Sequence, residues 1–347
     1  MNSMYLSRLL SLTFAVCIAC QGQEESVTYP NPEAPGVTLS GTLTKPSGGG
    51  LFPAVLLIAG PGPMDRDETI GSHKPFQVLA DYLTRHGIAV LRVDKRGVGK
   101  STGQFEQATT QDFASDAQAG VQYLMTRSDV DPKRIGLLGH GEGGLVAPMV
   151  AAKIPQIAFL VLIGAPGVNG EQILLEQTER SEKAAHIPEE QISADKEIGS
   201  MLYKMVREGK TPAQLSATLN GLPEDARVFA AHWQPQVQRM NSPWLHWFLS
   251  YDPAKVLEQV KCPVLAIDGE KDMQLDPERN LNAIKSALSH SGNHDVTVHL
   301  FPGLNYLLQP AKTGLGWEYE TIKETISPGA LDLIGKWIGQ HTAAATK

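Results

Sequence analysis

Residues 134–144 read RIGLLGHGEGG, and this stretch does most to decide the fold. The apolar residues of its first half are typical of a strand that is buried on both faces of a parallel sheet. The glycines that follow predict a tight turn, and the turn leads directly into a helix. At the centre of the turn lies Gly141, a residue without a side chain.

Short apolar runs and longer amphipathic segments alternate on both sides of this stretch. An alternating strand is expected at 37–43, and buried strands are expected at 53–59, 88–93, 134–138 and 159–163. Helices are expected at 74–86, 111–126 and 143–152. The pattern resumes with strands at 263–267 and 296–301 and a helix at 328–340. Such alternation predicts an α/β fold, a doubly wound and mostly parallel sheet with right-handed crossovers.

A long segment of different composition interrupts the alternation after residue 163. It is rich in Glu, Gln, Lys and Ala as far as Lys210 and then carries an aromatic cluster of Trp233, Trp244, Trp247, Phe248 and Tyr251. We expect a helical cap at 165–261 that covers a crevice at the carboxyl ends of the strands. The alternative is a peripheral helical subdomain whose aromatic residues pack on the body. The rest divides into a signal segment at 1–19, a linker at 20–36 and a core at 37–164 and 262–342.

Residues 1–19 are expected to direct export. Arg8 supplies the positive end, and the apolar run at 9–19 is too short to span a bilayer. Cys20, followed by polar residues, is typical of a bacterial lipoprotein with a lipid anchor on the cysteine. Because Cys17 is unusual at its place in that motif, simple secretion is the alternative. We expect a periplasmic or membrane-anchored lipoprotein, or a secreted protein, in which Cys262 has no partner for a disulfide.

Composition and motifs narrow the kind of ligand. The net charge of −7 gives no basic surface for nucleic acid, so a small molecule is the expected partner. No Cys or His spacing predicts a metal site, and no cofactor is expected. Residues 94–101 read DKRGVGKS, but Asp94 stands where a phosphate-binding loop needs its first glycine. This stretch instead resembles a D-x-R-G-x-G-x-S turn that follows a strand, so nucleotide binding is not expected.

The strand, turn and helix at 134–144 match the context of the G-x-S-x-G nucleophile elbow, with Gly141 in place of the serine. A glycine and proline loop, AGPGPMDRD, covers 59–67. From about residue 27 to 337 the chain resembles the α/β-hydrolase superfamily, in particular exported bacterial esterase- and peptidase-like members with a G-H-S-E-G-G elbow. Without the serine hydroxyl, the usual nucleophile of these enzymes is missing.

The resemblance assigns further positions of the expected site. The acid of the triad corresponds to Asp272 in the loop GEKD at 269–272, and the base corresponds to Tyr306 in the loop PGLNY at 302–306, where the family carries histidine. The oxyanion-hole donors would be backbone N–H groups near Met64 and at Glu142. His140 lies near the site but does not occupy the base position.

Three hypotheses follow from a triad in which only Asp272 matches. A chain with glycine instead of serine at position 141 and tyrosine instead of histidine at position 306 can bind a small acyl, ester or peptide-like ligand without turning it over. It can instead be a hydrolase of ester or amide bonds with weak or non-standard chemistry that uses Tyr306, Asp272 and Glu142 around a water molecule. The third hypothesis is a structural or surface-interaction protein. Binding without hydrolysis is the reading we favour.

Overall fold

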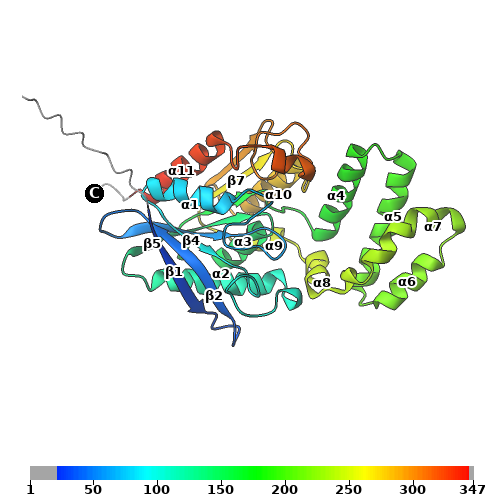
Figure 1. The fold of residues 1–347 in the computed structure, drawn as a ribbon, viewed down its shortest axis with the longest axis horizontal. Helices are drawn as coiled ribbons and strands as arrows, with labels where there is room; N and C mark the ends of the chain where they lie inside the picture. The colour runs from blue at the N-terminus through cyan, green and yellow to red at the C-terminus, as the bar shows by residue number, and fades with distance from the viewer. Residues whose placement is uncertain (1–21, 344–347) are drawn as a thin grey trace, which may run out of the picture.

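The computed structural model describes residues 22–343, and within them a single eight-stranded sheet runs in the order β1-β2-β4-β3-β5-β6-β7-β8 (Figure 1). Strands β1 and β2 are antiparallel to their neighbours, and the strands from β4 to β8 in this order are parallel. The bounds of the strands are β1 Gln23–Pro30, β2 Thr38–Lys45, β3 Phe52–Ile58, β4 Ala89–Val93, β5 Val130–His140, β6 Leu160–Ile163, β7 Val264–Gly269 and β8 Val296–Phe301.

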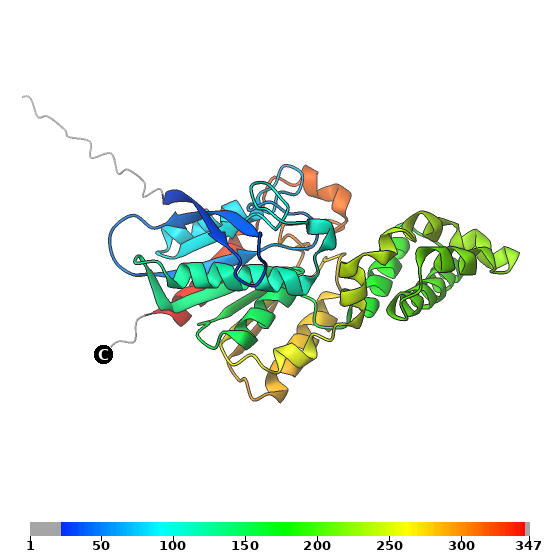
Figure 2. The same cartoon turned by 90° about the horizontal axis from the view of Figure 1, so that it is seen from below.

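Helices cover both faces of the sheet (Figures 1 and 2). Helices α1 (Pro75–Arg85) and α11 (Pro328–Thr342) bury their apolar residues against one face. The other face packs against α2 (Thr110–Met125), α3 (Gly143–Lys153), α9 (Ala254–Leu257) and α10 (Pro277–His290). Most residues of the central strands are apolar because these strands lie between the two layers. The expected doubly wound α/β fold is confirmed.

Strand β1 corrects the expected linker at 20–36. Residues Gln23–Pro30 pair along their full length with β2 at the edge of the sheet. Only Val27 and Tyr29 of this strand are buried, and the other residues are partly or fully exposed. An edge strand needs one apolar face only, so a polar sequence with two alternate apolar residues is sufficient. The signal segment at 1–19 and Cys20 lie outside the described residues, and export and lipidation remain predictions.

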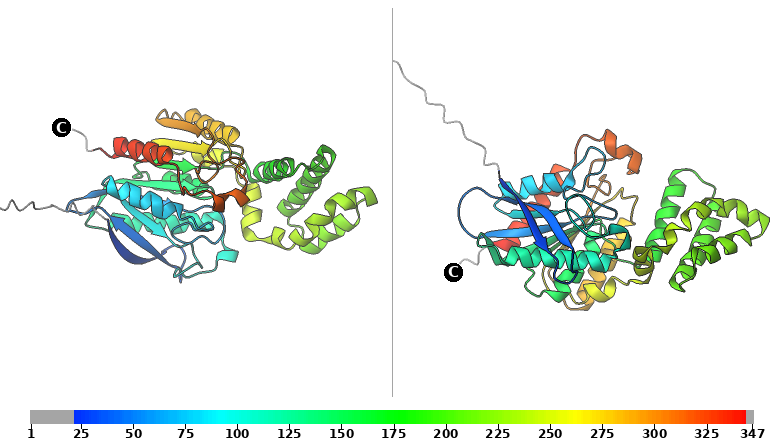
Figure 3. Two further views of the ribbon diagram at one scale, coloured as in Figure 1. Left: turned by 45° about the horizontal axis from the view of Figure 1, so that its top comes forward. Right: turned by 60° about the horizontal axis from the view of Figure 1, so that its bottom comes forward.

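A helical insertion occupies the chain between β6 and β7, and it projects from the sheet at the end where the elbow lies (Figure 3). Its main helices are α4 (Gly170–Ala184), α5 (Glu189–Arg207), α6 (Pro212–Asn220), α7 (Glu224–Ala230) and α8 (Pro243–Ser250). The insertion has a hydrophobic cluster of its own, centred on Leu202, Val206 and Trp233. No helix between residues 22 and 343 is long and apolar enough to cross a membrane.

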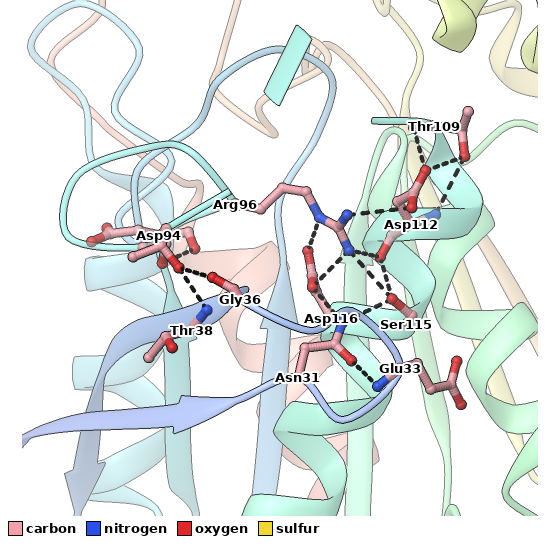
Figure 4. A network of polar contacts seen from close by, with 12 residues as sticks. Asn31, Glu33, Gly36, Thr38, Asp94, Arg96, Thr109, Asp112, Ser115 and Asp116 are labelled. Carbon is pink, nitrogen blue, oxygen red and sulfur yellow. Dashed lines mark hydrogen bonds and ion pairs between the residues drawn. The ribbon is translucent and has the colours of Figure 1, made fainter. Parts of the chain in front are cut away.

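The turn after β4 is held by polar contacts, as the sequence predicted for residues 94–101 (Figure 4). Arg96 donates hydrogen bonds to both carboxylate oxygens of Asp116 on α2, at 2.7 and 2.9 Å. The carbonyl oxygen of Asp94 accepts from the Ser101 hydroxyl at 2.7 Å. The side chain of Asp94 binds the guanidinium of Arg66. These groups are satisfied by one another, which fits a turn that anchors α2 to the sheet.

Candidate active-site elbow

Strand β5 ends at His140 and helix α3 begins at Gly143, so the predicted turn lies between them. Gly141 has a φ of +51°, in the left-handed region that favours glycine. A Cβ atom on Gly143 would lie 1.9 Å from the carbonyl oxygen of Ile58. A Cβ atom on Gly139 would lie 2.1 Å from the carbonyl oxygen of Gly143. The two flanking glycines are therefore required by close packing, and the turn has the geometry of a nucleophile elbow.

The hydroxyl of Tyr306 lies where the side chain of an elbow serine would begin. A Cβ atom on Gly141 would be 1.9 Å from the Tyr306 hydroxyl oxygen and 3.2 Å from its Cζ atom. Burial, followed by the negative charges of Glu68 and Asp272, raises the pKa of Tyr306 well above its ordinary value. A neutral phenol donates a hydrogen bond but is a poor nucleophile. The larger side chain at the base position thus fills the space that the missing serine leaves.

Asp272 lies fully buried in the loop after β7. Its Oδ1 atom accepts hydrogen bonds from the backbone N–H groups of Gln274 at 2.5 Å and Leu275 at 3.1 Å. Within residues 22–343, no backbone, amide or alcohol donor reaches its Oδ2 atom or Oδ2 of Asp268 on β7, and the two carboxyl groups interact with each other. The carboxylate therefore lies at the position expected for a triad acid, but the base position carries Tyr306, so no histidine there donates a hydrogen bond to it.

Asp268 and Asp272 form a coupled pair of buried carboxyl groups. Burial raises the pKa of Asp272 to about 6, while the hydrogen bonds from Gln274 and Leu275 limit the rise. Burial and the neighbouring charge of Asp272 raise the pKa of Asp268 well above its ordinary value. Two carboxylates this close cannot both ionise without a large electrostatic cost, so the pair retains one shared proton near neutral pH.

Of the two backbone N–H groups expected in the oxyanion hole, one is available to a ligand and the other is not. In residues 22–343 no acceptor takes the backbone N–H of Glu142, which lies at the start of α3 beside the elbow. The N–H of Met64 donates to the carbonyl oxygen of Gly62 at 2.9 Å. The group that faces the elbow from this loop is Pro61, whose Cδ atom would lie 3.2 Å from a Cβ atom on Gly141. Because proline has no N–H, the loop presents a ring here instead of a donor.

The side chain of Glu142 connects the elbow to the helical insertion. Its Oε1 atom accepts hydrogen bonds from the indole of Trp244 on α8 at 2.6 Å and from the hydroxyl of Thr110 at 2.7 Å. Its Oε2 atom binds the ammonium group of Lys95 at 2.8 Å. Glu142 and Lys95 are both buried, and their mutual contact compensates the two charges.

His140 lies under the elbow in a second ionic contact. Its Nδ1 atom is 3.0 Å from Oε2 of Glu68, and its Nε2 atom donates to the carbonyl oxygen of Tyr306 at 3.1 Å. Burial opposes the charged form of His140, but Glu68 raises its pKa above the ordinary value. The other carboxylate oxygen of Glu68 accepts from the N–H of Gly60 at 2.5 Å. This histidine therefore fixes the loops around the elbow and does not take the base position.

A pocket of about 180 Å³ opens between the elbow and the insertion, and we call it the elbow pocket. The elbow side contributes Gly141, Glu142 and Tyr306, and the insertion contributes apolar side chains. The full set of lining residues is Pro61, Gly141, Glu142, Gly164, Pro166, Ile173, Leu174, Gln177, Trp244, Phe248, Gln274, Leu275 and Tyr306. Glu142 carries the one ionic side chain in this set, and Lys95 neutralises it.

The structure brings some of the predicted site residues together and separates others. Gly141, Glu142 and Tyr306 line one pocket, and Asp272 lies buried behind it with a negative charge that reaches Tyr306. Met64 and His140 do not line this pocket. Sequence reasoning did not identify Glu68, Lys95 or Arg180 as residues of the site. Arg180 on α4 donates to the carbonyl oxygen of Asp272 and links the insertion to the acid loop.

Comparisons with known proteins agree with this geometry. The serine aminopeptidase S33 family of hydrolases matches residues 70–207, which include the elbow. Esterase EstD of Thermotoga maritima is 27% identical over 301 residues, which cover 86% of this chain and 65% of the esterase. An uncharacterized protein of Mycobacterium tuberculosis is 33% identical over 126 residues, which cover 36% of this chain and 41% of that protein. The matches thus span less than two thirds of the length of these relatives.

Solved structures share the fold at low sequence identity. The α/β hydrolase GrgF from Penicillium sp. sh18 has a TM-score of 0.59 and 18% identity, over 93% of this chain and all of that one. The esterase Pf2001 of Pyrococcus furiosus has a TM-score of 0.55 and 18% identity, over 93% and 94% of the two chains. The sheet order, the elbow and these similarities lead to one assignment. The chain has the α/β-hydrolase fold, and the sequences that it matches are esterase- and peptidase-like.

Proposed function

We propose that this protein binds a small, neutral acyl, ester or peptide-like ligand in the elbow pocket and does not hydrolyse it. The observation that carries the proposal is the Tyr306 hydroxyl at the apex of an elbow that has glycine in place of serine. A chain without the nucleophile and without the base has lost the two groups that transfer the proton and form the acyl-enzyme. The pocket beside them remains open.

Two hydrogen-bond donors favour a carbonyl group at the elbow end of the ligand. The Glu142 N–H is unpaired within the described part of the chain, and the neutral Tyr306 phenol lies at the same corner. The opposite wall consists of Ile173, Leu174 and other apolar residues of the insertion. An uncharged ligand with a carbonyl oxygen at one end and an aliphatic arm fits these surroundings. In this proposal the insertion is the cap of the site.

The raised pKa of Tyr306 supports this function over the alternative of an active hydrolase with non-standard chemistry. An attacking phenol must first lose its proton, and burial together with the negative charges around Tyr306 opposes that loss. An oxyanion-hole donor and ligand binding can by themselves produce weak turnover, and the assay below tests for it.

The test compares the natural chain with a variant that carries both Gly141→Ser and Tyr306→His. We expect no hydrolysis of p-nitrophenyl butyrate by the natural chain above that of its Asp272→Ala variant, and no labelling by a fluorophosphonate. The double variant is expected to be labelled at Ser in position 141. The unhydrolysed ester should raise the melting temperature of the natural chain, since a ligand that binds the native state stabilises it. Clear turnover that depends on Asp272 would instead establish the active hydrolase.

A further inference from the structure

A second pocket, of about 250 Å³, adjoins the elbow pocket. Both pockets are lined by Pro61, Glu142 and Trp244, so these three residues form a partition between the two spaces. The partition is closed by the hydrogen bond from the Trp244 indole to the Glu142 carboxylate at 2.6 Å. The Glu142 backbone N–H, where the carbonyl oxygen of a ligand would bind, belongs to the same partition.

Aromatic rings form the far wall of the second pocket. The rings of Phe105 and Phe113 are stacked, with their centroids 5.6 Å apart and an angle of 20° between their planes. The buried methyl group of Ala108 lies beside them, and Trp244 faces them from the insertion. The ammonium group of Lys95 lies 4.5 Å from the Phe113 ring centre and is already bound by Glu142. The remaining lining residues are Pro61, Gly62, Glu106, Glu142 and Ser242. The aromatic side of the pocket suits a flat aromatic group.

We propose that this second pocket, the aryl pocket (Phe105, Ala108, Phe113 and Trp244), binds an aromatic ring on the second arm of the ligand. The inference rests on the proposed function and specifies its ligand: a carbonyl compound with an aliphatic arm in the elbow pocket and an aryl arm in the aryl pocket. Aryl esters, aryl ketones and anilides share this shape. The carbonyl oxygen lies between the two arms, as Glu142 lies between the two pockets.

The movable part of the partition is the indole of Trp244. Pro61 is a rigid ring, and the Glu142 side chain is held by Lys95 and Thr110 as well as by Trp244. Rotation of the indole breaks one hydrogen bond and its stacking on Phe248, at 4.8 Å between ring centroids, whereas movement of the Glu142 side chain breaks three polar contacts. A ligand that occupies both pockets displaces the indole from Glu142, and a ligand confined to the elbow pocket leaves it in place.

The first experiment compares two ketones, which hydrolysis cannot consume. Butyrophenone and 2-pentanone carry the same propyl arm, and they differ in a phenyl against a methyl group. We expect the folded protein to bind butyrophenone about tenfold more tightly, since burial of a ring is worth more than a factor of ten in affinity. Phe105→Ala and Phe105→Leu should remove most of this difference. Leu174→Ala, in the elbow pocket, is the matched control and should weaken both ketones alike.

The outcomes distinguish the aryl pocket from the proposed function. Equal affinity for the two ketones in the natural chain, or a preference for butyrophenone that survives both Phe105 variants, would overturn the aryl pocket and leave ligand binding intact. Failure of both ketones to bind, together with ester turnover, would overturn the proposed function itself. Circular dichroism of each variant establishes that it is folded before affinity is compared.

The second experiment addresses the partition. Trp244→Phe removes the indole donor and keeps an aromatic ring, so butyrophenone no longer has to break a hydrogen bond to a carboxylate. We expect butyrophenone to bind to this variant about tenfold more tightly than to the natural chain, and the ratio of its affinity to that of 2-pentanone to rise by about the same factor. Trp247→Phe on the same helix is the control and should change neither affinity. Weaker binding of butyrophenone to Trp244→Phe would show that the indole holds the ligand and does not separate the pockets.

Discussion

At the scale of single residues, the glycine at position 141 and the tyrosine at position 306 depend on each other. Loss of a triad nucleophile or base alone removes nearly as much activity as loss of both. Once one of the two has changed, selection for hydrolysis therefore no longer maintains the other. The structure adds a steric link, because the Tyr306 hydroxyl lies in the space of a side chain at position 141. Serine and tyrosine cannot occupy these two positions in the observed conformation.

This steric link predicts a large coupling energy between the two positions. In the natural chain, Gly141→Ala is expected to cost about 1–2 kcal/mol for the left-handed backbone and about 1–3 kcal/mol more for the clash with the Tyr306 hydroxyl. In a Tyr306→Phe background the hydroxyl is absent, and the second cost should largely disappear. Urea unfolding of the four proteins measures the coupling. Additive effects of the two substitutions would place the hydroxyl away from the elbow.

The Asp268 and Asp272 pair predicts a dependence of stability on pH. The folded-state pKa of Asp272, about 6, lies above its ordinary value of 3.8, and that of Asp268 is raised further. The folded state therefore holds more protons than the unfolded state above pH 4, and its stability falls as the pH rises through this window. Asp268→Asn removes one charge and supplies an amide donor to Asp272. We expect the variant to be more stable than the natural chain at pH 7 and less sensitive to pH.

The measurement is the urea midpoint at pH 4, 5.5 and 7 for the natural chain and for Asp268→Asn. The exposed Glu278 on α10 provides the control, since Glu278→Gln removes a carboxylate that lies in solvent. A pH profile for Asp268→Asn that parallels the control would mean that the two buried carboxyl groups do not share a proton.

The sequence located the positions of Gly141, Asp272 and Tyr306 because each follows a strand with a recognisable apolar pattern. It did not reveal the contact of Glu68 with His140, since the two residues lie far apart in the chain and Glu68 is one of several acidic residues in a polar loop. The approach of Pro61 to the elbow was equally hidden. Such contacts depend on how two loops pack against each other in the folded chain, and the local sequence pattern of neither loop predicts this packing.

At the scale of elements, burial on both faces made the strands predictable. Strands β3, β4 and β6 were expected within a residue or two of their observed bounds, because their apolar runs have no competing helical period. Strand β5 extends further than its apolar run, to Val130–His140, since its first residues are polar and partly exposed. Strand β1 was not predicted because most of its residues are also polar and exposed, and only two of them are buried against the core.

Helices α4 and α5 carry a second pair of carboxyl groups, and these predict a pH effect within the insertion. Asp195 is buried and interacts with the carboxyl group of Glu182, and in the described part of the chain its oxygens accept no other hydrogen bond, with His232 3.7 Å away. Burial and the neighbouring Asp195 raise the pKa of Glu182 to about 8. The folded insertion binds this proton more tightly than the unfolded chain, so its stability falls as the pH rises from about 4.5 to 8.

Glu182→Gln is expected to flatten that fall, because the amide needs no proton at high pH. Hydrogen exchange of the amides in α4 and α5, at pH values corrected for intrinsic rates, measures the effect where it arises. Glu197→Gln on the exposed side of α5 is the matched control. If both variants keep the profile of the natural chain, His232 and water satisfy Asp195 without Glu182.

At the scale of the whole molecule, the sheet and the insertion are two hydrophobic units with a narrow junction. The main cluster of the insertion draws its residues from 198–249, and the clusters on the sheet draw none from α5, α6 or α7. The junction includes a small apolar cluster (Leu145, Ile173, Phe248 and Leu275), the hydrogen bond from Trp244 to Glu142, and the contact of Arg180 with the acid loop. Further polar links join Gln177 to Gln274 and Glu176 to Arg279 on α10. The links from Trp244 and Arg180 end on the elbow and the acid loop, so movement of the insertion alters the site directly.

This junction predicts that the insertion opens independently of the sheet. Trp244→Phe removes a hydrogen bond to a charged group, and amides in α4, α5 and α8 are expected to exchange about tenfold to a hundredfold faster as a result. Amides in β3 to β7 should keep their rates, because their burial between two helical layers does not depend on the junction. Trp247→Phe, on the same helix and stacked on Tyr251, is expected to leave exchange in α4 and α5 unchanged. Equal acceleration in the sheet would mean that insertion and sheet unfold as one cooperative unit, and the elbow pocket would then open only when the whole molecule unfolds.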